Sequence, residues 1–253
     1  MSFSLVRLQI FTLERCGVNG LYSDSWFRVM RSVSRLQIKE ATLNTKTNYH
    51  HGDLRNALLD AADALLQSEG LQGFTLRACA RQAGVSHTAP KHHFNDVRGL
   101  LTAVAERGFA RLVALLQARL APVKGDLDEE MFATAQAYAE FAQSYPEHFR
   151  IMFRADLLAV DPSCPPPAVI ATFTELTNVI LRQRGEPELA PAEMLLEKSP
   201  GLVNDIIIGW SHVHGYAHLR LEGQLMMVPE ESHAEHMRIA SRRLAQLIQS
   251  QAS

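Results

Sequence analysis

The chain has 253 residues, of which 47% are hydrophobic and 21% charged, and its formal net charge is −2. This composition is ordinary for a globular, cytoplasmic protein, and the lack of any run of about 18 apolar residues predicts no membrane-spanning segment. The cysteines lie far apart and lack the spacing of a disulfide framework or a zinc site, so we expect three reduced thiols, at Cys16, Cys79 and Cys164.

Residues 1–47 show no sustained hydrophobic periodicity, and their scattered apolar residues stand among Ser, Thr, Asn and Arg. Charge is unevenly distributed along the chain. Residues 1–52 carry seven Lys/Arg and three Asp/Glu, whereas the other 201 residues carry 18 basic and 24 acidic groups. We interpret residues 1–47 as a disordered basic extension, or as the product of a translation start assigned too early.

A first amphipathic helix is predicted in the stretch GDLRNALLDAADALLQSEG. Asp53 is a suitable N-cap for this helix, and Gly70 stands where a helix commonly ends. Apolar residues recur at helical spacing and predict one buried face, formed by Leu54, Leu58, Ala61 and Leu65.

Two short helices joined by a glycine turn are predicted in FTLRACARQAGVSHTAPKHHF. Thr75 is a good N-cap for the first helix, Gly84 ends it, and Ser86 is expected to cap the second. Val85 and Phe94 would face the interior. Two short helices with such a turn are the signature of a helix-turn-helix unit.

The second short helix has polar residues that suit DNA. We expect its donors to reach phosphates and base edges in the major groove. A metal site fits poorly, because adjacent histidines diverge by about 100° on a helix, and a catalytic pair lacks a nucleophile motif. The expected DNA contacts are Thr75, Arg77, Ser86, His87, Thr88, Lys91, His92 and His93, with Tyr49 reaching the DNA backbone from before the first helix.

The remainder of the chain is also predicted to be helical. A long helix is expected from Asp96 to about Leu120, and prolines mark several of the later junctions. No stretch alternates apolar and polar residues convincingly, so we predict an all-α protein. The later helical segments are 127–144, 146–158, 166–184, 191–221 and 230–251.

The stretch SHVHGYAHL places His214 and His218 four residues apart on one helical face. This is the spacing of a metal-binding pair, but no glutamate follows the first histidine as it does in the HExxH motif. The simpler interpretation is a buried helix with histidines at a packing or pocket surface. An all-α metal-binding protein or enzyme using His212, His214 and His218 stays as the alternative function.

Residues 48–109 resemble the DNA-binding domain of the tetracycline-repressor (TetR) family of bacterial transcription regulators. The resemblance rests on ALLDAADALLQSEGLQGFTLRACARQAGVSHTAPKHHFNDVRGLLTAV, which contains GxxxFTLR, AxxAGVS and HF ahead of a Leu-Leu pair. Downstream, YPEHFRIMFRADL and WSHVHGYAHLRLEG are similar to the regulatory domain of one branch of the family, in which a Trp/His/Gly-containing helix recurs.

The resemblance implies a helix-turn-helix domain over 48–102 and a helical ligand-binding and dimerisation domain over 103–253, without a cofactor or metal. It further implies a homodimer, formed through the last two helices, on a palindromic double-stranded operator. A small, largely apolar effector would release the repressor from DNA. The candidate pocket residues are Phe109, Met152, Phe173, Trp210 and His214.

Two positions depart from the family pattern. Lys91 stands where an aromatic residue is usual, and Val97 stands where a lysine is usual. Residues 48–101 also carry five basic and five acidic groups, so this region has no net charge. The region therefore lacks the basic surface that normally accompanies DNA binding. Because Lys91 replaces an aromatic backbone contact and Val97 removes a phosphate contact of the family, we expect the affinity or the operator sequence to differ from the family norm.

Overall fold

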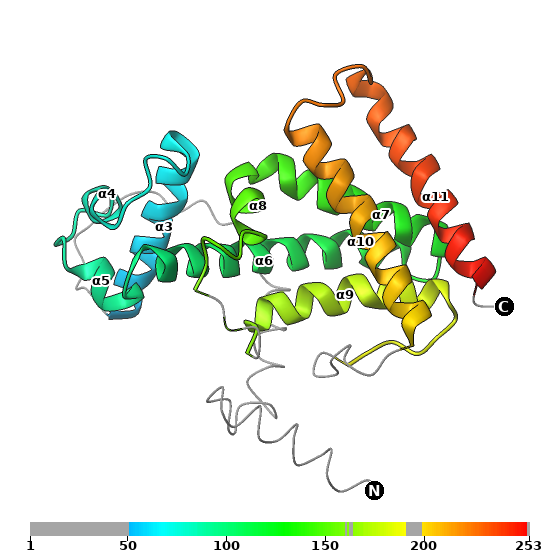
Figure 1. The fold of residues 1–253 in the computed structure, drawn as a ribbon, viewed down its shortest axis with the longest axis horizontal. Coiled ribbons are helices and arrows are strands. Elements are labelled where there is room, and N and C mark those ends of the chain that lie inside the picture. The colour runs from blue at the N-terminus through cyan, green and yellow to red at the C-terminus, as the bar shows by residue number, and fades with distance from the viewer. Residues whose placement is uncertain (1–50, 160, 162–163, 191–198, 252–253) are drawn as a thin grey trace, which may run out of the picture. The chain divides into compact units, whose positions relative to one another are not determined.

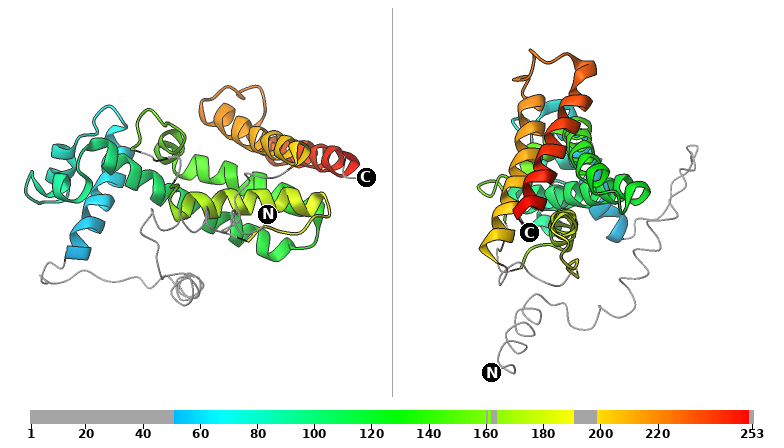
Figure 2. Two further views of the ribbon diagram at one scale, coloured as in Figure 1. Left: turned by 60° about the horizontal axis from the view of Figure 1, so that its bottom comes forward. Right: turned by 90° about the vertical axis from the view of Figure 1, so that its right-hand side faces the viewer.

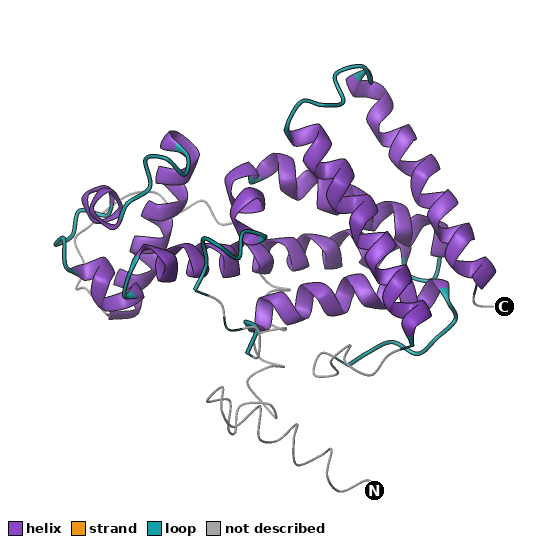
Figure 3. Cartoon of the chain, in the orientation of Figure 1, coloured by secondary structure: helices purple, strands orange, loops and turns teal. Residues whose placement is uncertain are grey.

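The computed structural model describes residues 51–159, 161, 164–190 and 199–251. Within these residues the regular structure is entirely helical, with nine α-helices, two short 3₁₀ turns and no strand (Figure 3). The prediction of an all-α fold is therefore confirmed. None of the helices in this part of the chain is both long enough and apolar enough to cross a membrane.

Four helices form the first part of the described chain: α3 (His51–Glu69), α4 (Leu76–Gln82), α5 (Ala89–Phe94) and α6 (Val97–Leu120) (Figure 1). α3 ends at Glu69 and is followed by Gly70, whose φ of 65° lies in the left-handed region that favours glycine. The helix begins two residues before Asp53, so the prediction that Asp53 caps it is wrong. Tyr49, a predicted DNA contact, lies outside the described residues.

Five helices form the second part: α7 (Leu127–Ser144), α8 (Pro146–Met152), α9 (Pro167–Gln183), α10 (Pro200–Leu221) and α11 (His233–Gln251). α7 packs against α6, α10 and α11, and α6 also packs against α8 and α9 (Figures 1 and 2). Short 3₁₀ turns, Ala121–Val123 and Glu230–Ser232, follow α6 and precede α11. Of the predicted segment 191–221, residues 191–198 lie outside the described residues.

α8 is shorter than the predicted segment 146–158. The helix ends at Met152, and the chain after it continues in hydrogen-bonded turns. Leu158 is buried, and its carbonyl accepts a hydrogen bond from the Arg98 guanidinium of α6. Packing against α6 therefore outweighs the local helical pattern in this segment.

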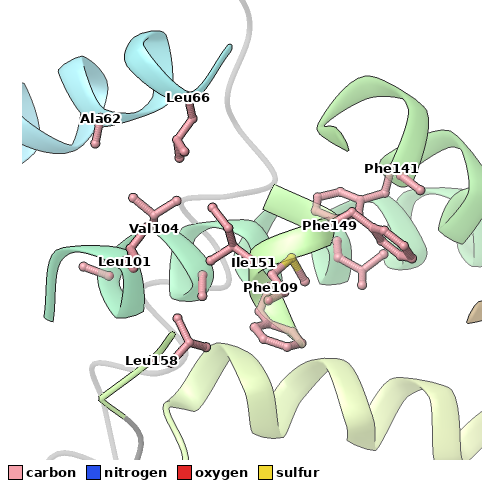
Figure 4. Packing of buried hydrophobic residues seen from close by; sticks show 14 of the residues in the cluster. Ala62, Leu66, Leu101, Val104, Phe109, Phe141, Phe149, Ile151 and Leu158 are labelled. Carbon is pink, nitrogen blue, oxygen red and sulfur yellow. The ribbon is translucent and has the colours of Figure 1, made fainter. Parts of the chain in front are cut away.

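One continuous apolar core joins α3, α6, α7 and α8. Ala62 and Leu66 of α3 are 0% and 1% exposed, and both point toward α6 (Figure 4). Val104 of α6 and Ile151 of α8 belong to the same buried cluster. Burial of a leucine-sized side chain stabilises a fold by about 2 kcal/mol, so apolar packing is a main force that holds α3 on α6.

The cysteines differ from the expectation of three reduced thiols. Cys79 is free and buried, and its Sγ donates to the Leu58 carbonyl at 3.1 Å. Burial raises the pKa of the Cys79 thiol to about 11. Cys164 is disulfide-bonded, which corrects the expectation for that residue, and Cys16 lies outside the described residues.

Candidate nucleic-acid interface and ligand cavity

The turn between α4 and α5 is built by a helix cap and a glycine. Thr75 caps α4 as predicted, because its hydroxyl accepts a hydrogen bond from the Ala78 N–H at 3.0 Å. Gly84, with a φ of 67°, lets the chain leave α4, and the Val85 N–H then donates to the Ala80 carbonyl at 3.0 Å. Local hydrogen bonds thus define the turn before α5 begins.

The start of α5 differs from the prediction. The helix begins at Ala89 with Thr88 at the N-cap position, so the prediction that Ser86 caps it is wrong. The Ser86 carbonyl instead accepts a hydrogen bond from the Ala89 N–H at 3.0 Å, and its hydroxyl lies 3.2 Å from the Thr88 hydroxyl. Both side chains are exposed, so each hydroxyl keeps hydrogen-bonding capacity for a phosphate oxygen.

α5 buries some of its side chains and exposes the polar ones. Its buried side chains are Ala89, Pro90 and Phe94. His93 is half-buried, and its ring centroid lies 6.2 Å from that of Phe94. The predicted DNA contacts that are exposed are Thr75, Arg77, Ser86, His87, Thr88, Lys91 and His92. The short helix therefore presents hydroxyl, imidazole and ammonium groups to solvent while apolar side chains anchor it.

A small cavity of about 30 Å³ lies between α7, α9 and α10. Its lining is apolar apart from the side chains of Thr134 and Thr177. Phe173 and Trp210, two of the predicted pocket residues, contribute to its wall. This volume holds only one or two water molecules, so a drug-sized ligand enters only if side chains move apart.

Aromatic rings from three helices, α6, α9 and α10, meet around Phe153, which lies just after α8. The Phe153 ring centroid lies 5.6 Å from that of Phe109, 6.0 Å from that of Trp210 and 4.6 Å from that of His214. The Phe173 ring lies 5.4 Å from the Trp210 ring. The structure thus brings four of the five predicted pocket residues into one aromatic cluster.

Phe153 and Tyr138 contact the predicted pocket residues but are not among them. Phe153 directly follows Met152, the fifth predicted residue, and could have been found from the sequence as its neighbour. Met152 is buried. A Cβ added at Gly108 of α6 would lie only 2.6 Å from the Met152 Sδ, so α8 packs closely on α6 at this glycine. Tyr138 of α7 gave no local signal, because its hydrogen-bond partners are on α10.

Tyr138 connects Trp210 and His214 in a hydrogen-bonded relay. The Trp210 Nε1–H donates to the Tyr138 hydroxyl oxygen at 3.2 Å, and that oxygen lies 3.0 Å from His214 Nδ1. An indole N–H can only donate. The Tyr138 side chain is fully buried, so its own O–H is satisfied if it donates to His214 Nδ1.

The donor and acceptor roles in this relay define which ring nitrogen of His214 carries the proton. Burial lowers the pKa of His214, and the neighbouring His218 lowers it further, which favours the neutral ring. Because Nδ1 accepts from Tyr138, the neutral ring carries its proton on Nε2. Nε2 forms no hydrogen bond with the described residues.

Comparison with known protein families shows the family of the chain. Residues 58–104 match the family described as bacterial regulatory proteins, tetR family. Residues 131–243 match the family described as tetracyclin repressor-like, C-terminal domain. Together the two matches cover more than half of the chain and include both α5 and the relay. This chain belongs to the TetR family.

Solved structures of other proteins share the fold of this chain. A protein of unknown function from Rhodococcus sp. RHA1 is 29% identical, with a TM-score of 0.60 over 79% of this chain and 98% of that one. A TetR-family transcriptional regulator from Streptomyces coelicolor is 17% identical, with a TM-score of 0.53 over 77% and 99%. A TetR variant from Acinetobacter baumannii AYE, in complex with minocycline, is 18% identical, with a TM-score of 0.52 over 81% and 99%.

The alternative function, a metal-binding protein or enzyme that uses three histidines of α10, gains no support from the structure. The His214 and His218 rings stack with centroids 6.5 Å apart. The Nε2 of His212 is buried without a hydrogen-bond partner among the described residues, and burial lowers the pKa of His212. Across the described ranges, no three His, Cys, Asp or Glu side chains are arranged to hold a metal ion.

Replacing Tyr138 with phenylalanine tests the relay. The change leaves the Trp210 N–H and His214 Nδ1 without a partner, so we expect the free energy of unfolding to fall by about 1–2 kcal/mol. Urea unfolding followed by circular dichroism measures the loss. Tyr145→Phe is the control, because Tyr145 is exposed and its hydroxyl makes no hydrogen bond within the described residues. Equal stabilities for the two variants would reject the relay.

Proposed function

We propose that the chain is a homodimeric transcription repressor, acting in the cytoplasm without a cofactor, that a small ligand releases from a palindromic operator. The observation that carries this proposal is α5, which is anchored by Phe94 and exposes Lys91 and His92. Polar donors on an exposed short helix after a glycine turn suit major-groove contacts. We retain 48–102 as the DNA-binding domain and 103–253 as the ligand-binding and dimerisation domain.

Lys91 and Val97 are expected to affect the affinity of this regulator for DNA. Lys91 is exposed on α5, where its ammonium group can contact a phosphate or a guanine edge. Val97 is 37% exposed at the first position of α6 and brings no charge to the DNA. Because Val97 supplies no charge where the family usually has a lysine, the electrostatic part of DNA binding depends more strongly on Lys91 in this chain than it would with a lysine at residue 97.

Exposed apolar side chains on α10 and α11 support the dimer. Large hydrophobic residues at 36–53% exposure recur on these two helices: Val203, Ile207, Leu219, Ile239 and Leu247. Apolar residues exposed on neighbouring helices are typical of a surface that a second subunit covers. A two-fold axis between the helices would make a four-helix bundle and place two DNA-binding domains on one operator.

Ile207→Glu tests the dimer surface. Ile207 is 53% exposed, so a glutamate is tolerated in the monomer but would be desolvated beneath a second subunit. We expect sedimentation velocity to show monomers at micromolar concentration where the unchanged chain is dimeric. Met226→Glu, at an 89% exposed residue in the turn before α11, is the control and should remain dimeric. A dimeric Ile207→Glu variant would exclude this surface.

The ligand cavity favours an apolar effector that carries a hydrogen-bond acceptor. Apolar side chains line most of the cavity, and the aromatic rings around Phe153 extend that environment. The His214 Nε2–H is available to a carbonyl, ether or carboxylate oxygen. An effector that separates Trp210 from Phe153 would enlarge the cavity toward His214 and stabilise a conformation with lower operator affinity.

Operator stoichiometry tests the proposed function as a whole. We expect two protomers to bind one palindromic duplex, and analytical ultracentrifugation with labelled duplex measures the mass of the complex. A duplex that keeps one half-site and scrambles the other should bind at least about tenfold more weakly. Equal affinity for both duplexes would contradict the dimeric mechanism.

A further inference from the structure

Asp63 of α3 is the centre of an ionic cluster that reaches α6 and α8. Its side chain is 17% exposed. Asp63 Oδ2 accepts from Arg107 Nη1 at 3.0 Å and from Arg111 Nη2 at 2.6 Å, both on α6. Asp63 Oδ1 lies 3.0 Å from Nε2 of His148, a residue of α8 that is 5% exposed. Three helices therefore meet at one carboxylate.

His148 Nε2 faces two groups with opposite requirements. It lies 3.0 Å from Asp63 Oδ1, which only accepts when ionised, and 3.0 Å from Arg111 Nη1, which only donates. A ring nitrogen holds either a proton or a lone pair. Nε2 can therefore satisfy Asp63 or Arg111, and the position of the imidazole proton decides whether α8 is bonded to α3 or to α6.

The surroundings favour the bond to Asp63. Arg111 already donates to Asp63 Oδ2, and its guanidinium lies 4.8 Å from the Tyr145 ring centroid. Its side chain is also 32% exposed, so water can serve its remaining donors. Asp63 is less exposed, and losing the His148 donor would leave Oδ1 without a hydrogen-bond partner among the described groups. Losing this hydrogen bond costs the Asp63 oxygen more free energy than it costs the more exposed Arg111 guanidinium.

A second carboxylate belongs to the same cluster. Asp60 of α3 accepts from Arg107 Nη1 at 2.6 Å, so the cluster contains two carboxylates and two guanidiniums. With both pairs ionised, the two carboxylates balance the two guanidiniums, and a proton on His148 Nε2 completes the hydrogen bonds of Asp63. The Tyr145 ring, a further titratable group, packs on His148 with its centroid 5.8 Å from that of the imidazole.

We propose that His148 is a positioning residue through which α8 sets the placement of α3 for operator binding, by donating from Nε2–H to Asp63. The inference rests on the proposed DNA-binding function. His148 directly precedes Phe149, whose ring stacks on His214 with centroids 5.0 Å apart. A ligand that displaces Phe149 would therefore move the donor that α3 depends on. No direct contact between the ligand and α3 is needed.

Two amide substitutions at His148 test the proposal in the full chain. A glutamine amide reaches the place of Nε2–H, whereas an asparagine amide reaches only the place of Nδ1. We expect His148→Gln to bind the selected operator within about twofold of the unchanged chain, and His148→Asn to bind about tenfold more weakly. Fluorescence anisotropy with labelled duplex measures both affinities. Equal loss in the two variants would overturn the proposal.

A second measurement keeps the test independent of DNA. Hydrogen exchange should accelerate in the amides of α3 in His148→Asn and stay unchanged in His148→Gln, because only the asparagine releases Asp63. Long-range ¹⁵N NMR on the unchanged chain should show His148 protonated on Nε2. A lone pair on Nε2, or equal exchange in both variants, would overturn the proposal even if operator binding is strong. If no operator is bound while α3 responds as expected, the DNA-binding function fails and the α8–α3 contact stands.

Discussion

Replacing Asp63 with alanine is expected to lower the free energy of unfolding by about 3 kcal/mol. The change removes the carboxylate that Arg107, Arg111 and His148 share. Their guanidiniums and imidazole would then be partly buried without a counter-charge. This value is at the low end of the range for breaking a buried ion pair. The side chains of Arg107 and Arg111 are 21% and 32% exposed, so water can hydrate them once the carboxylate is removed. Urea unfolding monitored by circular dichroism measures it.

Asp60→Ala is the matched control for this stability test. Asp60 lies one helical turn from Asp63 and also accepts from Arg107, but its side chain is 72% exposed. An exposed ion pair contributes at most about 1 kcal/mol. Equal destabilisation by the two alanine variants would show that the cluster around Asp63 does not hold α3 on α6 and α8.

Asp63 is also expected to make the free energy of unfolding depend on pH in the acid range. Burial by itself would raise the pKa of Asp63, but the hydrogen bonds from His148, Arg111 and Arg107, together with the His148 charge, outweigh it and lower the pKa to about 2. Because the folded-state pKa lies below that of the unfolded chain, the stabilisation is present above about pH 4 and is lost as the pH falls toward 2. The stability difference between the unchanged chain and Asp63→Ala should shrink over that range.

Lys91→Glu is expected to weaken operator binding by about a hundredfold. Lys91 is exposed on α5, and Val97 supplies no compensating charge at the start of α6. A glutamate at residue 91 would lose a favourable contact and bring a negative charge toward the phosphates. The thermal unfolding midpoint should not change, because an exposed side chain contributes little to stability. Fluorescence anisotropy at fixed ionic strength measures the affinity.

Lys124→Glu is the control for charge reversal. Lys124 is 69% exposed and lies between α6 and α7, with its ammonium group 3.7 Å from Glu188. The net charge of the chain changes equally in both variants, so a general electrostatic effect would weaken DNA binding to the same extent. We expect Lys124→Glu to bind the operator within about twofold of the unchanged chain. Similar losses in the two variants would argue against a specific DNA contact by Lys91.

Helix boundaries could be predicted where local chemistry sets them. α6 follows Asp96, whose carboxylate accepts from the Gly99 N–H at 2.8 Å, and α7 begins after Asp126, which accepts from the Glu129 N–H at 3.1 Å. Both caps can be recognised in the sequence. The end of α8 could not be predicted, because Leu158 is buried by contacts with a helix that lies far away in the sequence.

The candidate sites were predictable in the same uneven way. The exposure of Lys91 and His92 follows from the spacing of neighbouring buried residues on a short helix. The pairs Tyr138–His214 and Asp63–His148 join residues 76 and 85 positions apart. No local pattern links such residues, so their hydrogen bonds became visible only when the helices were placed together. The prediction that Ser86 caps α5 was wrong because the chain makes one further hydrogen-bonded turn after Ser86, and α5 begins only at Ala89.

The most direct test of DNA reading by a dimer is selection from a random duplex library at neutral pH and low salt, with the purified full chain. We predict enrichment of a palindrome whose half-sites are about one helical turn apart, centre to centre. Repetition with Lys91→Glu should abolish the enrichment. A folded, dimeric chain that enriches no sequence, or an asymmetric one, would contradict the proposal that two copies of α5 read an operator.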